Sequence, residues 1–340
     1  MGKIEIIRID PLDYKDSIIK LWEKNLPDTP KSRFNWMERN PEGPSVWYVA
    51  RDEKRGVIGT ISIMPRVVLI NCRKYLAGIV GDLTIDKAFR TLGPALNLLK
   101  TVLFKQSEMG FDFLYTYPNT DALKITIFAG FKKLSVIKRL VKPLNVRNKL
   151  EENFSSQLVN ITYPIINGFL KILSKETYMK KNEMLMEEDQ STLSEFSINQ
   201  FGILLEEQLD TIGRRNYKYI KWKYFDNPQY SFRIFIYTHS PGKSIQGYII
   251  CTILDNTVHI FDILAKSKQL YKLMLGQFIK RMRELKYSSI SININHDNPM
   301  FYFFKYFGFI DRRDNTPLLY KSDKEIIPIN WLFFNGDRNI

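Results

Sequence analysis

Two stretches of this chain of 340 residues carry the same local patterns in the same order. Each begins with a short helical segment that holds a central tryptophan and ends in Asn-Pro. A strand, a hairpin and a strand with an acid near its middle follow, and each stretch closes on Gly-Phe. The matching residues are Trp36 and Trp222, Asp82 and Asp262, and Phe131 and Phe309. The shared order predicts a tandem duplication, which restricts the fold more than any single motif. We expect both tryptophans to anchor the core.

The length and composition agree with two units. A chain of 340 residues is about twice a typical domain. Apolar residues make up 44% of it, which is enough for each half to bury its own core. We therefore expect an N-terminal domain, a helical linker, a second domain and a C-terminal tail. Their predicted bounds are 1–145, 146–190, 191–325 and 326–340.

A loop in the first copy has the layout of a phosphate site. The apolar strand pattern at 79–85 leads through Arg90-Thr91-Leu92-Gly93-Pro94-Ala95 into a helix pattern at 95–104. Such a loop leaves backbone N–H groups without partners, and the positive end of the helix dipole adds to them, so a pyrophosphate is the expected guest. At this place the second copy has 265–271, with no glycine to let the backbone approach a phosphate. We expect only the first copy to bind a cofactor.

This loop resembles the acetyl-coenzyme A pyrophosphate loop, (Gln/Arg)-x-x-Gly-x-(Gly/Ala), of the GNAT superfamily of acyltransferases. A second GNAT hallmark lies downstream, where a strand is followed by Asn119-x-x-Ala and a closing Gly130-Phe131. The resemblance implies an α/β (α+β) protein with two tandem GNAT-like domains, each a mixed, mostly antiparallel, splayed sheet flanked by helices. The layout is also similar to bacterial tandem GNAT proteins associated with polysaccharide biosynthesis.

The same resemblance implies acetyl-CoA, or another acyl-CoA, as the cofactor. The backbone of the strand before the loop would hold the thioester, and the loop itself would bind pyrophosphate. The implied thioester residues are Leu83, Thr84 and Ile85; the implied pyrophosphate residues are Arg90, Thr91, Leu92, Gly93, Pro94 and Ala95; and Asn119 completes the cofactor set. Pro94 departs from the family pattern because it has no N–H, although its fixed φ suits a first helical turn.

Acyl transfer to an amine needs a base for the ammonium proton and an acid for the leaving thiolate. Asp82 is the candidate base, because burial in a cleft would raise its pKa toward a useful value. The alternative is a structural hydrogen bond at a strand bulge, since Asp262 occupies the same place in the second copy. Where this chain has Thr126, many GNAT members carry a tyrosine that acts as the general acid. Tyr115 and Tyr117 on the preceding strand are substitutes, or else core residues.

The activity expected from this resemblance is acyl-CoA-dependent N-acyl transfer, most simply acetyl transfer, to an amine. An amino sugar or a nucleotide-linked amino sugar is the first expectation for the acceptor, by analogy alone. A Fem-like aminoacyltransferase that uses aminoacyl-tRNA is one alternative, although it does not need an intact pyrophosphate loop. A non-catalytic binding protein with the GNAT fold is the other.

The net charge of +14 favours anionic partners. Eight basic residues and no acid lie between Asp121 and Glu151, which indicates either a solvated face or a surface for a membrane, a nucleotide-linked sugar or an RNA. These are Lys124, Lys132, Lys133, Lys138, Arg139, Lys142, Arg147 and Lys149. Nucleic acid is the less expected of these partners.

An amphipathic helix pattern follows Pro164 and extends to Leu173. We expect it to pack between the two domains. The alternative is insertion into a membrane interface, since Lys171, Lys175, Lys180 and Lys181 flank its apolar face.

The remaining features indicate a cytoplasmic protein. Cys72 and Cys251 lie in separate apolar patterns, so we expect no disulfide framework and a reducing compartment. The chain start lacks the apolar region of a signal peptide, and no run reaches the roughly 18 apolar residues of a membrane span. His239, His259 and His296 lie far apart without ligand-like spacing, so we assign no metal site.

Overall fold

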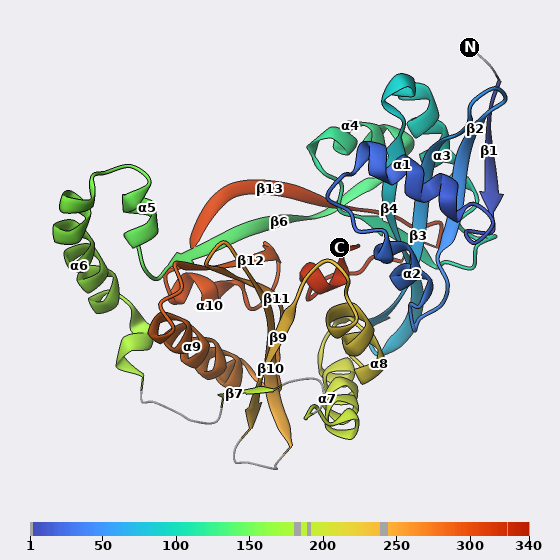
Figure 1. The fold of residues 1–340 in the computed structure, drawn as a ribbon. Coiled ribbons are helices and arrows are strands. Elements are labelled where there is room, and N and C mark those ends of the chain that lie inside the picture. Colours follow the sequence, from blue (N-terminus) through green and yellow to red (C-terminus); the bar gives the residue numbers. More distant parts are fainter. Residues whose placement is uncertain (1–2, 180–184, 189–191, 239–243, 325, 340) are drawn as a thin grey trace.

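The computed structural model describes residues 3–179, 185–188, 192–238, 244–324 and 326–339. Lys180, Lys181, His239 and the side chain of Lys149 therefore lie outside the described residues. The strands form one 13-stranded sheet in the order β1-β2-β3-β4-β5-β13-β6-β12-β11-β10-β9-β7, with β8 paired to β3 (Figure 1). Strand pairs are antiparallel except β4 with β5 and β11 with β12. A mixed, mostly antiparallel sheet flanked by helices confirms the predicted fold class.

The described residues of the first half supply six strands of the long sheet and four α-helices. Their bounds are β1 Ile4–Ile9, α1 Lys15–Asn25, α2 Ser32–Glu38, β2 Val46–Asp52, β3 Gly56–Ile70, β4 Arg73–Ile85, η1 Lys87–Phe89, α3 Leu92–Phe104, β5 Phe113–Thr116, α4 Thr120–Ala129 and β6 Lys132–Pro143. The helix predicted at 95–104 begins three residues earlier, because Thr91 has the extended backbone of an N-cap.

A helical segment leads into the second half. The bounds are α5 Arg147–Glu151, α6 Ser156–Ile172, η2 Lys175–Tyr178, β7 Leu185–Glu188, α7 Glu195–Gln208, β8 Thr211–Gly213, α8 Tyr217–Ile220, η3 Lys221–Phe225, β9 Phe232–Thr238, β10 Ile245–Leu254, β11 Thr257–Ala265, α9 Lys268–Glu284, β12 Ser289–Asn295, α10 Phe301–Tyr306, β13 Ile310–Lys321 and η4 Asn335–Asp337.

The two halves share one sheet because each gives its last long strand to the other. Strand β6 pairs with β12, where Leu140 lies opposite Ile292. Strand β13 pairs with β5, where Tyr320 lies opposite Tyr115, and β6 and β13 pair with each other at the centre. From β1 inward and from β7 inward, the series of antiparallel and parallel pairs is the same. The boundary predicted near residue 145 therefore separates chain segments but not sheets.

Trp36 and Trp222 meet where the halves join. Their rings stack with centroids 4.5 Å apart and an interplanar angle of 6°. Each indole Nε1–H donates to the other residue's carbonyl oxygen at 2.8 Å. Both side chains are buried, so the prediction that they anchor the core is confirmed. The structure adds that they anchor one shared core.

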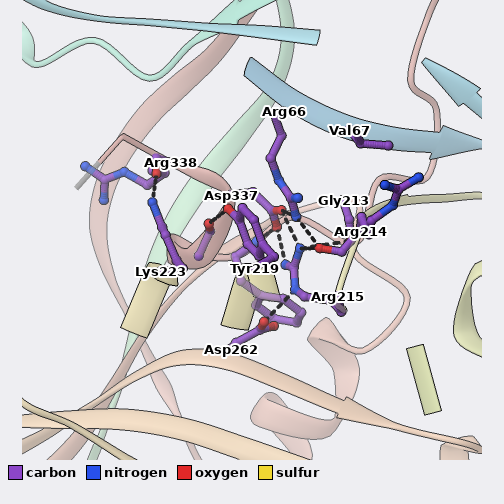
Figure 2. A network of polar contacts seen from close by, with 12 residues as sticks. Arg66, Val67, Gly213, Arg214, Arg215, Tyr219, Lys223, Asp262, Asp337 and Arg338 are labelled. Carbon is purple, nitrogen blue, oxygen red and sulfur yellow. Dashed lines mark hydrogen bonds and ion pairs between the residues drawn. The ribbon is translucent and has the colours of Figure 1, made fainter. Parts of the chain in front are cut away.

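The segment predicted as a C-terminal tail is instead central. Trp331, Leu332, Phe333 and Phe334 are all buried, and the C-terminal end lies between the two halves (Figure 1). Asp337 accepts hydrogen bonds from Arg66 of β3 and from Arg215, which precedes α8 (Figure 2). Two buried guanidinium groups from different halves thus hold one carboxylate of this segment. Burial without these partners would be costly for all three charges.

Helices α5 and α6 project from the side of the second half, far from the N-terminal half (Figure 1). The prediction that the amphipathic segment packs between the two halves is therefore wrong. Periodicity reports that a helix has an apolar face, but it does not report what covers that face.

Candidate acyl-CoA and acceptor site

A cavity opens where β4 and β5 diverge. These strands pair in parallel only over Ala77–Ile79 and Phe113–Tyr115, and β4 continues to Ile85 without β5 beside it. The space between them is a cavity of about 250 Å³. Residues from β4, from the segment after β5 and from α4 line it, including Asp82, Leu83, Thr84, Tyr117, Asn119 and Thr126. Strand β4, which is predicted to hold the thioester, and Asn119, the predicted cofactor residue of the second hallmark, therefore line the same cavity.

The N-terminus of α3 is exposed and without a side-chain cap. Thr91 is the N-cap, but its side chain accepts no hydrogen bond from the first turn in the described structure. A Cβ built on Gly93 would meet only the Thr91 hydroxyl oxygen, at 3.9 Å, so the backbone there is open to a ligand. Pro94 lies within the first turn, where its missing N–H removes no helical bond. This geometry fits a pyrophosphate.

Arg90 lies at the edge of this loop and is exposed. Its Nε donates to the Ile85 carbonyl oxygen at 3.3 Å, and its Nη2 donates to Asn25 at 3.4 Å. No carboxylate pairs with it among the described residues, so its charge is available to an anion. Its role toward pyrophosphate stays a prediction, as do those of Thr91, Leu92 and Ala95.

Asn119 and the Gly-Phe pair have structural roles. The Asn119 side chain accepts a hydrogen bond from the Ala122 amide at 2.9 Å and so caps α4. Gly130 ends that helix with a φ of 123°, a conformation that favours glycine, and Phe131 is buried. The Thr126 hydroxyl donates back to the Ala122 carbonyl oxygen at 2.7 Å. The second GNAT hallmark thus shapes the cavity wall.

Asp82 lies in a β-bulge of β4 with a φ of 49° and accepts three side-chain hydrogen bonds. The donors are Arg33 at 3.1 Å, Ser62 at 2.7 Å and Asn339 at 2.7 Å. Burial alone would raise its pKa, but the Arg33 charge and these hydrogen bonds outweigh burial and lower it. The expectation of a raised pKa is therefore wrong, because the sequence does not show Arg33 and Asn339 beside this carboxylate.

The two strand tyrosines differ in their surroundings. Tyr115 is buried, and its hydroxyl donates to the Asp337 carbonyl oxygen at 2.7 Å. Burial raises its pKa well above 10. Its hydroxyl is thus committed to the C-terminal segment, which argues against the predicted acid role. Tyr117 borders the cavity, and the Arg338 guanidinium lies 3.8 Å from its ring centroid.

A second cavity of about 390 Å³ adjoins the first and is built by both halves. Asp82, Arg338 and Asn339 line both cavities and form the wall between them. Arg33 belongs to the first half, and Tyr230 and Asn293 belong to the second. Sequence reasoning missed Arg33, Arg338 and Asn339. The only signal for the last two was the apolar run Trp331-Leu332-Phe333-Phe334, which indicates a buried segment just before them.

The corresponding opening in the second half is filled by the chain itself. Strand β11 pairs with β12 only up to Ile260 and Ile292, and η4 lies against β11 beyond that point. The Asn293 side chain donates to Asn335 at 3.3 Å. A Cβ on Gly336 would collide with the Tyr224 hydroxyl, so the segment fits closely. Asp262 is enclosed there by Arg215 at 2.6 Å, Tyr224 at 3.1 Å and Tyr248 at 3.2 Å.

No protein-family model and no curated protein matches this sequence. Solved structures do match. A conserved protein of unknown function from Enterococcus faecalis V583, described as a probable N-acyltransferase, superimposes with a TM-score of 0.69 at 11% identity, over 95% of this chain and 73% of that one. A GCN5-related N-acetyltransferase from Anabaena variabilis ATCC 29413 gives 0.65 at 12%, over 94% and 73%. The chain has the GNAT fold.

A third match links the GNAT fold of this chain to a protein described with its ligand. N-myristoyltransferase of Saccharomyces cerevisiae with bound myristoyl-CoA gives a TM-score of 0.59 at 11% identity, over 95% of this chain and 79% of that one. Such coverage means that both halves, and not the first alone, enter the superposition. At these low sequence identities the structural likeness establishes the fold alone. The reaction has to be inferred from the residues of the site.

The basic segment between Asp121 and Glu151 is not one free face. Lys142 is buried, and its ammonium donates to the Phe307 carbonyl oxygen and pairs with Glu176 at 3.3 Å. Lys138 pairs with Asp311 at 2.9 Å and Arg139 with Asp314 at 3.4 Å. Acids from β13 and η2 thus neutralise some of the segment's charge.

None of the helices among the described residues is long and apolar enough to cross a membrane.

Proposed function

We propose that this protein is an acyl-CoA-dependent N-acyltransferase that transfers an acyl group, most simply acetyl, to an amine. The observation that carries the proposal is the exposed, uncapped first turn of α3 at Gly93, together with the open cavity between β4 and β5. A phosphate-binding helix end and an adjacent cavity of about 250 Å³ suit an anionic carrier with a reactive group at its far end.

In this proposal each group around the cavity wall has a different role in the reaction. The bound acyl-CoA supplies an activated thioester. The backbone of Leu83–Ile85 orients its carbonyl group, and the acceptor amine arrives from the second cavity. Asp82, held ionised by Arg33, attracts the ammonium form and orients a water molecule that carries its proton to solvent. Tyr117 is the proton donor for the leaving thiolate, because Tyr115 is committed to Asp337. The amine displaces the thiolate, so one C–N bond forms and one C–S bond breaks; Tyr117 protonates the sulfur and recovers a proton from the attacking nitrogen.

The second cavity supports an amino sugar, free or linked to a nucleotide, as the acceptor. Gln229, Asn293 and Asn335 offer amides that exchange hydrogen bonds with hydroxyl groups, and Tyr230 and Phe261 offer aromatic faces. Arg338 has a buried Nε without a hydrogen-bond partner in the described structure, which favours an acceptor with an anionic group.

We also infer that the two halves arose by duplication, as the repeated sequence patterns predict. Two observations support this: the strand order is the same from both ends, and the Trp36 and Trp222 side chains exchange equivalent hydrogen bonds. In this account the first copy holds the acyl-CoA and the second copy completes the acceptor site.

Calorimetry with acetyl-CoA and longer acyl-CoAs, followed by a thiol-release assay with amino sugars and simple amines, tests the proposal. We expect saturable acyl-CoA binding and thiol release only when an amine is present. Absence of acyl-CoA binding would contradict the proposal, and thiol release with an unrelated amine but no amino sugar would contradict the acceptor assignment.

A non-catalytic role is the alternative that specific observations also support. The lowered pKa of Asp82 and the committed Tyr115 hydroxyl also fit a non-catalytic acyl-CoA-binding protein that kept the fold. The same two measurements separate the proposals, because the alternative predicts binding without thiol release for every amine.

A further inference from the structure

Helix α6 presents a stripe of five large apolar side chains to solvent. Leu158, Ile161, Ile165, Phe169 and Ile172 are each between 54% and 66% exposed. Their spacing of three or four residues puts them on one face, over a length of roughly 21 Å at 1.5 Å per residue. Soluble proteins rarely expose a continuous apolar strip of this kind without a partner for it.

The opposite face of α6 fixes this orientation. Val159 is buried. The Asn167 side chain donates to Asn145 at 2.9 Å and accepts from the Val146 amide at 3.1 Å. The Arg147 guanidinium of α5 lies 5.1 Å from the centre of the Tyr163 ring. The helix is therefore held by its polar and buried side, and no described part of the chain covers the stripe.

Unpaired positive charge lies at the C-terminal end of the same helix. Lys171 is exposed in its last turn. The ammonium groups of Lys175 and Lys272 lie 3.8 and 4.1 Å from the centre of the Tyr306 ring. Within the described residues neither pairs with a carboxylate. They border a cavity of about 410 Å³ whose wall includes Leu273, itself 41% exposed.

We propose that α6 lies flat in the interface of an anionic lipid bilayer. The stripe would enter the acyl boundary, and Lys171, Lys175 and Lys272 would meet the headgroup phosphates. A span is excluded for α6, because 17 residues are shorter than the roughly 20 that a bilayer core requires. The net charge of +14 opposes pairing of the stripe with a second copy and favours a negatively charged surface.

Vesicle co-sedimentation of the full chain tests this surface. The vesicles are phosphatidylcholine alone or phosphatidylcholine with phosphatidylglycerol. We expect binding to the anionic vesicles that weakens as salt is raised. The Ile165→Asp, Phe169→Asp double variant should bind at least about tenfold more weakly, and Lys175→Ala, Lys272→Ala should lose several-fold. Phe196→Asp, at an even more exposed apolar position on α7, is the control and should bind as the parent does.

Three outcomes would overturn the proposal. The first is absence of binding to anionic vesicles, and the second is binding that the Ile165 and Phe169 changes leave intact. The third is a parent protein that sediments as a dimer which the same changes dissociate, since the stripe would then be covered by a second copy. Equal melting temperatures of parent and variants show that each variant is folded.

Discussion

In both halves a pair of parallel strands diverges next to an acid at a bulge, but in the second half η4 of the C-terminal segment packs into the opening. In the first half Asp82 borders two cavities. In the second half Asp262 is fully buried among Arg215, Tyr224 and Tyr248, and η4 occupies the opening. The C-terminal segment therefore distinguishes the halves as much as the loop sequence does.

The helices that follow Asp82 and Asp262 also differ in how their first turns are capped. The first turn of α3 has no side-chain cap, whereas Ser267 caps α9 by accepting a hydrogen bond from the Leu270 amide at 3.2 Å. A capped turn has one fewer N–H for an outside anion. In the second half a side chain of the protein thus binds a first-turn N–H group of the helix. In the first half the equivalent N–H groups are left for a ligand.

The largest expected effect follows from the strands that the halves exchange. A fragment of residues 1–145 keeps β6 but loses both of its partners, β12 and β13, and β5 loses β13. We expect it to show no cooperative unfolding transition by circular dichroism and to aggregate, because several strand edges are exposed. Co-expression with residues 146–340 is the control and should restore solubility. A monomeric fragment that melts cooperatively would show that the halves are independent.

The two acids should differ in what they contribute to stability. Asp262→Asn removes a fully buried carboxylate that accepts hydrogen bonds from Arg215, Tyr224 and Tyr248. Arg215 keeps Asp337 as a partner, but three buried donors lose their charged acceptor, so we expect a loss of about 3–5 kcal/mol in the free energy of unfolding. Asp82→Asn should cost about 1–2 kcal/mol, because Arg33 keeps Asn339 as a partner and lies beside a cavity. Urea titration measures both. Equal losses would mean that Asp82 is as structural as Asp262.

Gly93→Val tests the open helix end. Because a Cβ at this position meets nothing closer than 3.9 Å in the protein, the variant should fold normally. It should bind acetyl-CoA on the order of 10-fold more weakly, since one charge-assisted hydrogen bond is worth about 1.5–3 kcal/mol. Ser267→Ala is the matched control in the second half, expected to lose about 1 kcal/mol of stability and no affinity. Unchanged calorimetric binding by Gly93→Val would refute the loop assignment.

The smallest expected effect concerns pH. The folded state lowers the pKa of Asp82 below its ordinary value of 3.8. Its contribution to stability is therefore complete above that value and is lost as the pH falls through the folded pKa. The difference in unfolding free energy between the parent and Asp82→Asn should shrink between pH 7 and pH values below about 3. A difference that stays constant over this range would show that the carboxylate is not held ionised.

Local patterns were enough to predict the features that neighbouring residues determine. The strand, loop and helix around Gly93 and the buried Trp36 and Trp222 all follow from short-range spacing. The exchange of β6 and β13 does not, because either strand could pair within its own half with the same alternation. The environment of Asp82 depends on Asn339, which is 257 residues away in the chain, and no local signal connects the two.

The exchanged strands also set an order of events on the ribosome. Strand β5 is made early, but the strand that covers its open edge begins at Ile310, almost two hundred residues later. Until then the N-terminal half exposes a sheet edge and an unfinished core, a situation that slows folding and invites misassociation. The N-terminal half therefore cannot complete its part of the sheet until almost the whole chain has been synthesised.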